Sequence, residues 1–291
     1  MRVLITGVSG QLGHDAAKEL IARGVPFLGI GSKELDITDR DAVLRVFSEY
    51  CPDAVLHCAA YTMVDRAEDE PEHCMRVNAD GTRHIAEACR EIGAKLLYVS
   101  TDYVFPGTGD KPWETDDPTG PLNVYGQTKL AGEQAVRELV EKHFIVRTSW
   151  VIGEHGSNFV KTMLRLAETH RELRVVDDQI GSPTFTANLA PLLCDMLETE
   201  KYGVYHATNE GFCSWAELAE AVFHLAGKDV SIHHVSTEEY GAKAPRPKNS
   251  RLSKASLDAG GFVRLPGWEA SLARMLEKEN SNERAECSPG F

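Results

Sequence analysis

RVLITGVSGQLG, residues 2–13, joins a short apolar run to three regularly spaced glycines and then to an amphipathic stretch. The apolar run reads as a strand and the stretch after Gly13 as a helix. Glycines at such a turn let the backbone approach a pyrophosphate, whose charge is met by free N–H groups at the helix N-terminus. A strand before the glycines and a helix after them are the context that a dinucleotide-binding turn requires.

The pattern of the first turn continues along the first 150 residues. We expect strands at Arg2–Thr6, Pro26–Ile30, Asp53–His57, Lys95–Ser100 and Phe144–Thr148, separated by helices at Leu12–Arg23, Asp39–Tyr50, Pro71–Ile92 and Val124–Lys142. Strands spaced by helices, with no hairpin signals, indicate βαβ crossovers and a parallel sheet covered on both faces. The predicted fold class is therefore α/β, a doubly wound (Rossmann) parallel sheet.

The pattern is looser beyond residue 150. We expect helices at Asn158–Thr169 and Ala187–Glu198 and strands at Arg174–Val176 and Gly203–Ala207, then a smaller, irregular α/β C-terminal lobe with a frayed end at 280–291. The second helix and strand look like a return to the sheet. We therefore assign 1–149 and 184–208 to an NAD(P)-binding Rossmann domain, and 150–183 and 209–291 to a substrate-binding lobe.

The composition excludes several classes of protein. A formal charge of −13 argues against nucleic-acid binding. No stretch approaches the roughly 18 apolar residues of a membrane span, and the seven cysteines contain no CxxC pair. The eleven histidines show no HxxxH spacing, so we expect no metal site. These features favour a cytoplasmic protein with reduced cysteines.

The adenosine end of the predicted site is ambiguous. An Asp or Glu closing the second strand would hold a ribose 2′-hydroxyl, but this strand runs into Ser32 and Lys33. Lys33 can pair with a 2′-phosphate, whereas Glu34 would act the other way, and a solvated surface lysine is an equally good interpretation. We expect NADPH as the cofactor, with NADH tolerated.

Tyr125 and Lys129 lie four residues apart and so share one helical face. A phenol is a poor acid at neutral pH unless a nearby cation stabilises the phenolate. The pattern is weak alone and gains weight from Thr101, which ends the fourth predicted strand and offers a hydroxyl to a substrate oxygen. Asn78, in the third predicted helix, serves either helix packing or a water relay behind Lys129.

The GxxGxxG spacing resembles short-chain dehydrogenases/reductases, and longer stretches narrow the resemblance. VLHCAAYTMVDRAEDE, RVNADGT, YVSTDYVF, PLNVYGQTKLAGEQ, VRTSWVIG, DQIGSPT and APRPKNSRL together resemble the dTDP-4-dehydrorhamnose reductases of the extended superfamily. The similarity covers nearly the whole chain. It implies reduction, with NAD(P)H, of the C4 keto group of a 4-keto-6-deoxy sugar nucleotide, and it leaves a homodimer open.

The resemblance also assigns residues to roles. The catalytic set is Thr101, Tyr125 and Lys129. The cofactor would meet Gly7, Gly10, Gln11, Leu12, Gly13, Asp36, Ile37, Ala59, Ala60 and Tyr61, together with Ser32, Lys33, Asn78, Tyr125 and Lys129. The sugar nucleotide would meet Val64, Thr101, Asp102, Tyr103, Tyr125 and Trp150, although an ordinary core position explains Trp150 as well.

Three other functions compete with the reductase. Related dehydratases carry Thr-Asp-Glu at the end of the fourth strand, whereas this chain has Thr101-Asp102-Tyr103 and lacks the second carboxylate. A nucleotide-sugar epimerase is harder to exclude from superfamily features. A non-catalytic NADP-binding regulatory subunit, similar to the β subunit of methionine adenosyltransferase, could retain all three catalytic residues.

Overall fold

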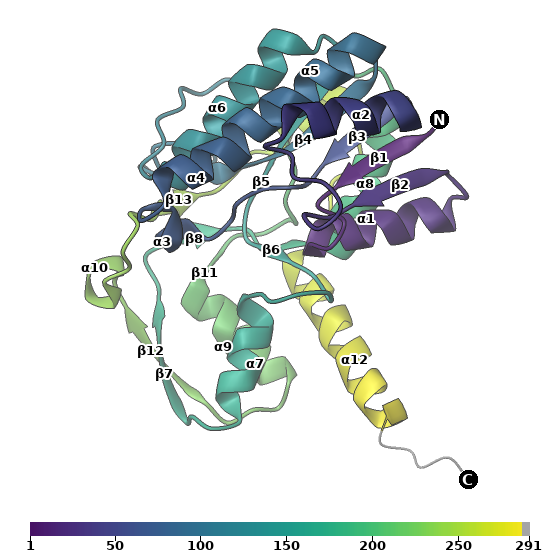
Figure 1. Cartoon of the computed structure of the whole chain (residues 1–291). Coiled ribbons are helices and arrows are strands. Elements are labelled where there is room, and N and C mark those ends of the chain that lie inside the picture. Colours follow the sequence, from purple (N-terminus) through teal and green to yellow (C-terminus); the bar gives the residue numbers. More distant parts are fainter. Residues whose placement is uncertain (287–291) are drawn as a thin grey trace.

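A central sheet of six strands organises the molecule (Figure 1). The computed structural model describes residues 1–286, and the side chains of residues 1–278. All six strands are parallel, in the order β10-β5-β4-β3-β1-β2. Their bounds are β1 Val3–Thr6, β2 Phe27–Ile30, β3 Ala54–His57, β4 Lys95–Thr101, β5 His143–Thr148 and β10 Gly203–His206. The expected doubly wound parallel sheet is confirmed.

Helices cover both faces of this sheet. One face carries α1 (Gln11–Ala22) and α8 (Thr186–Leu197), and the other carries α2 (Arg40–Tyr50), α5 (Thr82–Ile92) and α6 (Val124–Leu139). In β1, Val3 and Ile5 belong to the core under α1 and α8, whereas Leu4 belongs to the core under α2, α5 and α6. Successive strand residues point to opposite faces, so a sheet buried on both sides needs an unbroken apolar run.

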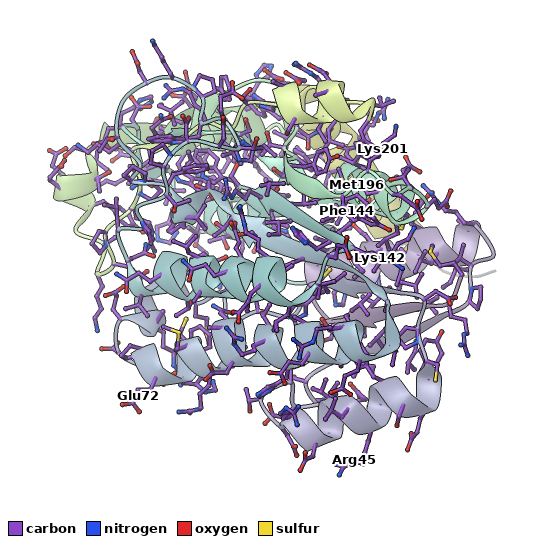
Figure 2. All side chains as sticks on the ribbon, turned by 90° about the horizontal axis from the view of Figure 1, so that it is seen from above. Arg45, Glu72, Lys142, Phe144, Met196 and Lys201 are labelled. Carbon is purple, nitrogen blue, oxygen red and sulfur yellow. The ribbon has the colours of Figure 1, made fainter. Side chains whose placement is uncertain are left out.

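Figure 2 shows the same layering from above. Phe144 of β5 and Met196 of α8 are fully buried between sheet and helix. Arg45 of α2, by contrast, points outward and is exposed. Glu72 does the same from α4, a short helix over Pro71–Met75.

The rest of the chain forms a smaller lobe beside the carboxyl ends of the strands (Figure 1). Its helices are α7 Phe159–Ala167, α9 Trp215–Leu225, α10 Thr237–Tyr240 and α12 Trp268–Glu286, whereas α11 (Ala255–Gly260) packs against β10 and contributes Leu257 to the core under α1 and α8. Its strands are β6 Val151–Ile152, β7 Glu172–Val176, β8 Ile180–Gly181, β9 Thr184–Phe185, β11 Cys213–Ser214, β12 Ser231–Val235 and β13 Asn249–Ser250. They form a three-stranded sheet (β11-β8-β13) and two strand pairs (β12-β7 and β6-β9).

Several expected elements need correction. The single helix expected at Pro71–Ile92 is α4 followed by a π-helical segment, η1 (Arg76–Gly81), and then α5. The helix expected to reach Lys142 ends at Leu139, because β5 begins at His143. Within the first 150 residues, two further elements were not expected, α3 (Val64–Ala67) and η2 (Asp102–Val104).

The C-terminal expectation was also wrong in part. The long helix α12 continues to Glu286, although residues 280–291 were expected to fray, and 287–291 lie outside the described residues. Leu272, Met275 and Leu276 bury one narrow stripe of α12 in the core of the smaller lobe. Within the described part of the chain, no helix combines the length and apolar character that crossing a membrane demands.

Candidate active site

A cavity of about 890 Å³ lies at the carboxyl ends of the central strands. Its wall is formed by residues that follow β1, β2, β3, β4 and β5 in turn, and by Trp215 and Phe159 from the smaller lobe. In the strand order, β2 lies on one side of β1 and β3 lies on the other, so the direction in which strands are added to the sheet reverses at β1. Ligands of doubly wound sheets bind at such a switch point.

The glycine turn after β1 leaves no room for side chains. Gly7 has φ +71°, and a Cβ there would lie 2.7 Å from the Ala59 nitrogen. A Cβ on Gly13 would lie 2.3 Å from the Gly7 carbonyl oxygen. Both glycines line the cavity, as do Gly10, Gln11 and Leu12. The turn therefore presents bare backbone and the N-terminus of α1 to the cavity, as a pyrophosphate site requires.

Gln11 joins this turn to the smaller lobe. Its Oε1 accepts hydrogen bonds from the Gly153 nitrogen at 2.8 Å and from Asn158 Nδ2 at 3.0 Å. The His155 ring also contacts the Ser9 carbonyl oxygen at 3.2 Å. The segment between β6 and α7 is thus fastened over the glycine turn and closes one side of the cavity.

Thr101, Tyr125 and Lys129 all line this cavity. Thr101 stands at the end of β4, while Tyr125 and Lys129 project from the first turns of α6, whose N-cap Asn123 accepts a hydrogen bond from the Gly126 nitrogen. Lys129 Nζ donates to the Val99 carbonyl oxygen at 2.8 Å and lies 4.0 Å from the centre of the Tyr98 ring. The structure thus brings the three expected catalytic residues to one wall.

Burial changes the acidity of two of these groups. It lowers the pKa of the Lys129 ammonium to about 7, although the nearby Glu133 carboxylate partly offsets this. Burial also raises the pKa of the Tyr125 phenol, an effect that a hydrogen bond with Thr101 reduces. Tyr125 therefore holds its proton at neutral pH and is a potential proton donor.

Asp102 and Tyr103 follow Thr101 into the same cavity. Asp102 Oδ1 accepts a hydrogen bond from the Thr101 hydroxyl at 3.0 Å. Its Oδ2 is buried without a well-formed hydrogen bond, although the Ser250 hydroxyl is close enough to affect its acidity. Burial raises the pKa of Asp102 to about 6, against the opposing effect of Ser250 and Thr101. The Tyr103 ring meets the Tyr125 ring edge to face, with 5.5 Å between the ring centres.

Trp150 closes the far wall with an unusual backbone conformation. It has φ +48°, and its indole stacks on that of Trp215 with 3.7 Å between the ring centres. A non-glycine residue rarely adopts this left-handed region unless its surroundings enforce it. Gly181 leaves the space for the indole, since a Cβ there would lie 2.9 Å from the ring. Val64 also lines the cavity.

At the end of the cavity beside β2, where the sequence predicts the adenosine, Ser32, Asp36 and Ile37 line the wall but the exposed Lys33 does not. Glu34 Oε2 accepts a hydrogen bond from the Gly31 nitrogen at 2.9 Å. A Cβ on Gly31 would meet this carboxylate oxygen at 2.9 Å and the Ser9 hydroxyl at 3.2 Å. The carboxylate of Glu34 therefore lies beside the end of β2.

Only some of the expected residues after β3 line the cavity. Ala59 and Ala60 line the cavity, whereas Tyr61 and Asn78 lie behind it. Several other lining residues were not predicted from the sequence, namely Ser9, Cys58, Thr62, Ser149, Phe159 and Trp215. Trp215 and Phe159 come from the smaller lobe, and no local motif indicated that they reach the sheet.

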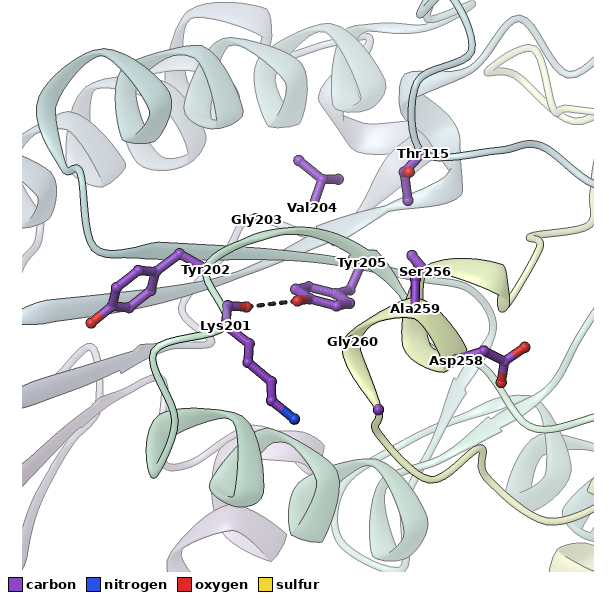
Figure 3. A pocket seen from close by; sticks show the side chains of 11 residues that line it. Thr115, Lys201, Tyr202, Gly203, Val204, Tyr205, Ser256, Asp258, Ala259 and Gly260 are labelled. Carbon is purple, nitrogen blue, oxygen red and sulfur yellow. Dashed lines mark hydrogen bonds between the residues drawn. The ribbon is translucent and has the colours of Figure 1, made fainter.

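A second hollow, of about 680 Å³, lies beside the edge strand β10 (Figure 3). Its wall includes Tyr205, whose hydroxyl donates to the Lys201 carbonyl oxygen at 2.6 Å, and Asp258, which pairs with Arg264. This hollow is wide open, and the glycine turn and the Thr101, Tyr125 and Lys129 cluster are not part of it. Among the described residues, no group of three or more His, Cys, Asp or Glu is arranged to hold a metal ion.

The sheet order and the cavity at the switch point define a Rossmann-type dinucleotide-binding architecture. Residues 1–281 match the family model described as the RmlD substrate binding domain. The chain belongs to this family.

Named relatives agree with that assignment. The chain is 45% identical to a dTDP-4-dehydrorhamnose reductase of Streptomyces griseus, over 93% of this chain and 91% of the relative. It is 42% identical to the spore coat polysaccharide biosynthesis protein SpsK of Bacillus subtilis, over 96% and 98%. Among solved structures, dTDP-4-dehydrorhamnose reductase from Bacillus anthracis in complex with NADP superimposes with a TM-score of 0.93 and 45% identity, covering 95% of this chain and 99% of that one.

Proposed function

We propose that this protein is an NADPH-dependent oxidoreductase that reduces the C4 keto group of dTDP-4-dehydro-L-rhamnose to give dTDP-L-rhamnose, and that it accepts NADH less well. The observation that carries the proposal is the meeting of Thr101, Tyr125 and Lys129 with the glycine turn in one cavity. The family and the named reductases at 39–45% identity support the substrate. The solved relative in complex with NADP supports the cofactor.

The cavity fits a dinucleotide on grounds of its own. Gly7 and Gly13 form a cradle that any Cβ would fill, and the N-terminus of α1 behind it is suited to a pyrophosphate. Ser32, Asp36 and Ile37 would meet the adenosine, and Ala59 and Ala60 would lie along the cofactor. When bound, the nicotinamide supplies the hydride.

The residues of the chain then complete the reduction. Tyr125 donates its phenolic proton to the oxygen that becomes an alkoxide, and the Thr101 hydroxyl polarises the same oxygen. The Lys129 ammonium stabilises the phenolate that remains on Tyr125. Asp102, whose Oδ2 has only the Ser250 hydroxyl nearby, accepts a hydrogen bond from a sugar hydroxyl, while Val64, Tyr103 and Trp150 pack beside the sugar nucleotide.

A direct assay tests the proposal. Purified protein should oxidise NADPH in step with conversion of dTDP-4-dehydro-L-rhamnose to dTDP-L-rhamnose, identified by mass and sugar stereochemistry. It should not form a keto sugar from dTDP-glucose, because Tyr103 stands where the related dehydratases carry Glu. Keto-sugar formation would overturn the reductase assignment, and cofactor binding without turnover would favour a regulatory subunit.

The remaining expectations belong to the same proposal. We place the enzyme in the cytoplasm, where sugar nucleotides are made, with a sugar nucleotide as its partner and no nucleic acid. A homodimer is a further prediction, which sedimentation of the purified chain would decide.

A further inference from the structure

His57 is the last residue of β3 and is fully buried directly behind the cavity. Its Nδ1 lies 2.6 Å from the Thr6 hydroxyl, and its Nε2 lies 3.0 Å from the Thr82 hydroxyl. Thr6 and Thr82 are both buried as well. Neither His57 nor Thr82 lines the cavity, so neither can touch a ligand there.

The neighbouring groups decide which ring nitrogen carries the proton. The Thr82 hydroxyl donates to the Asn78 carbonyl oxygen at 2.8 Å, so its oxygen is left to accept from His57 Nε2–H. Burial lowers the pKa of His57 to about 3, which makes the ring neutral. Nδ1 therefore accepts from the Thr6 hydroxyl, and the Thr6 oxygen in turn accepts from the Ala59 nitrogen at 3.3 Å.

This row of hydrogen bonds holds both ends of the segment that lines the cavity after β3. Thr6 holds Ala59 at one end. At the other end, Asn78 Oδ1 accepts from the Tyr61 nitrogen at 2.8 Å, and Asn78 Nδ2 donates to the Tyr61 carbonyl oxygen at 3.0 Å. His57 and Thr82 connect the hydrogen bond at Ala59 to those at Tyr61. The whole row therefore fixes the backbone of residues 59–61.

A branch of the row reaches the catalytic helix. Asn78 Nδ2 also donates to the Thr128 hydroxyl at 3.0 Å, and that hydroxyl donates to the Tyr125 carbonyl oxygen at 2.9 Å. Thr128 directly precedes Lys129. Asn78 lies in η1, and the Thr82 hydroxyl bonds to the Asn78 carbonyl four residues earlier, at a point where a regular α-helix is interrupted.

We infer that His57 is a positioning residue for hydride transfer. As the Nε2–H tautomer it couples the segment Ala59–Tyr61, of which Ala59 and Ala60 line the cavity, to the helix that carries Tyr125 and Lys129. The inference rests on the proposed function for its effects on kcat and on NADPH binding. The tautomer itself follows from the hydrogen bonds and from the burial of the ring. Tight placement matters because small errors in the position of reacting groups cost large factors in rate.

Two substitutions of His57 separate the hydrogen bond of Nδ1 from that of Nε2. In His57→Asn the shorter amide can still accept from Thr6 but cannot reach Thr82, so kcat should fall roughly tenfold or more while NADPH affinity stays within about twofold. In His57→Gln the amide can donate to Thr82 while the acceptor for Thr6 is lost, so NADPH affinity should weaken more than in His57→Asn. Thr82→Val is nearly isosteric and removes the same hydrogen bond as His57→Asn, so it should show the same loss of kcat. It provides the test if either histidine variant folds poorly.

Thr184→Val is the matched control, because the Thr184 hydroxyl is equally buried but makes no hydrogen bond and does not line the cavity. Rates are normalised to NADPH-binding sites, so that loss of folded protein does not count as loss of catalysis. A merely structural role would lower stability and leave kcat per site unchanged. Values of kcat and NADPH affinity within twofold of the parent in His57→Asn, His57→Gln and Thr82→Val would overturn the inference.

Nitrogen NMR of histidine-labelled protein gives a test that needs no turnover. The signals missing in His57→Gln identify His57, which should show protonated Nε2, unprotonated Nδ1 and no titration between pH 5.5 and 8. A protonated Nδ1, or a ring that titrates in that range, would refute the assigned direction of the hydrogen bonds. Failure of the parent to reduce the keto sugar would instead count against the proposed function and leave this test standing.

Discussion

Glu133 and Arg147 form an ion pair inside the protein, with Arg147 Nη2 2.8 Å from Glu133 Oε2 and side-chain exposures of 0% and 1%. Glu133 Oε1 also accepts from Arg147 Nε at 2.8 Å and from the Ser100 hydroxyl at 2.6 Å. Glu133 lies one helical turn after Lys129, and Ser100 directly precedes Thr101. The pair therefore ties α6 to β4 and β5 immediately behind the proposed catalytic residues Thr101, Tyr125 and Lys129.

Breaking this pair should destabilise the fold strongly. Glu133→Gln leaves the Arg147 charge buried without its partner, which typically costs about 3–5 kcal/mol. Urea unfolding measures the loss. Glu138→Gln is the control, since Glu138 pairs with Arg83 on the surface and such pairs contribute about 1 kcal/mol or less. Equal losses of unfolding free energy in the two variants would show that the buried pair stabilises the fold no more than the surface pair does.

Removing the proposed proton donor should abolish most turnover and spare binding. Tyr125→Phe keeps the ring against Tyr103 but has no proton to give, so kcat should fall by roughly 10²- to 10⁴-fold with NADPH affinity nearly unchanged. Steady-state kinetics and fluorescence titration measure the two quantities. Tyr240→Phe, at an exposed tyrosine, should behave like the parent. A kcat for Tyr125→Phe within a factor of about two of the parent would refute the assignment.

Lys129 should cost the protein stability at neutral pH. Because burial lowers its pKa to about 7, the unfolded chain binds the extra proton more tightly between pH 7 and its ordinary pKa of 10.5. Stability is therefore lowest below pH 7 and rises with pH through that window. Lys129→Met should be inactive but more stable than the parent at pH 6, and the difference in unfolding free energy should shrink toward pH 10. A difference independent of pH would contradict this.

Asp102 should show the opposite pH window. Burial raises its pKa from 3.8 to about 6, so the folded state holds the proton more tightly and the parent loses stability as pH rises from 4 to 6. Asp102→Asn cannot ionise, so its stability relative to the parent should increase by about 1–3 kcal/mol between pH 4 and pH 7. Thermal unfolding at the two pH values checks this. The same variant should raise KM for the keto sugar.

Cofactor preference should depend on two adjacent side chains. If Lys33 reaches a 2′-phosphate, Lys33→Ala should weaken NADPH relative to NADH by about 1 kcal/mol. Glu34→Gln should change the preference the other way, because it removes a carboxylate that lies beside the end of β2. Dissociation constants for both cofactors decide the matter. Equal effects on NADPH and NADH would show that neither residue reads the 2′ position.

The central sheet could be predicted from the sequence because most of its strands are short apolar runs separated by amphipathic stretches. The glycine turn and the Tyr125 and Lys129 spacing were equally local features, and the structure brings them together. Lys33 was harder, since a turn of exposed residues does not reveal which side chain faces a cavity.

The smaller lobe could not be predicted in the same detail. Its sheets consist mostly of two-residue strands paired across long stretches of chain, as when β8 pairs with β11 and β13. Such pairings leave no periodic signal. Trp215 was missed for the same reason, because its place beside Trp150 depends on the packing of α9. The row of hydrogen bonds through His57 depends on polar contacts between residues up to 53 positions apart, which no local pattern encodes.

The position of α8 and β10 has a consequence for how the chain acquires its structure. The buried face of α1, which includes Leu12, Ala16 and Leu20, packs against α8, and β5 is completed on its outer side by β10. During synthesis the ribosome must therefore release the whole segment between them before the first helix finds its partner. Closing so long a loop slows folding and leaves an apolar surface exposed meanwhile. The apolar face of α1 therefore stays uncovered in the newly made N-terminal half until α8 has been synthesised.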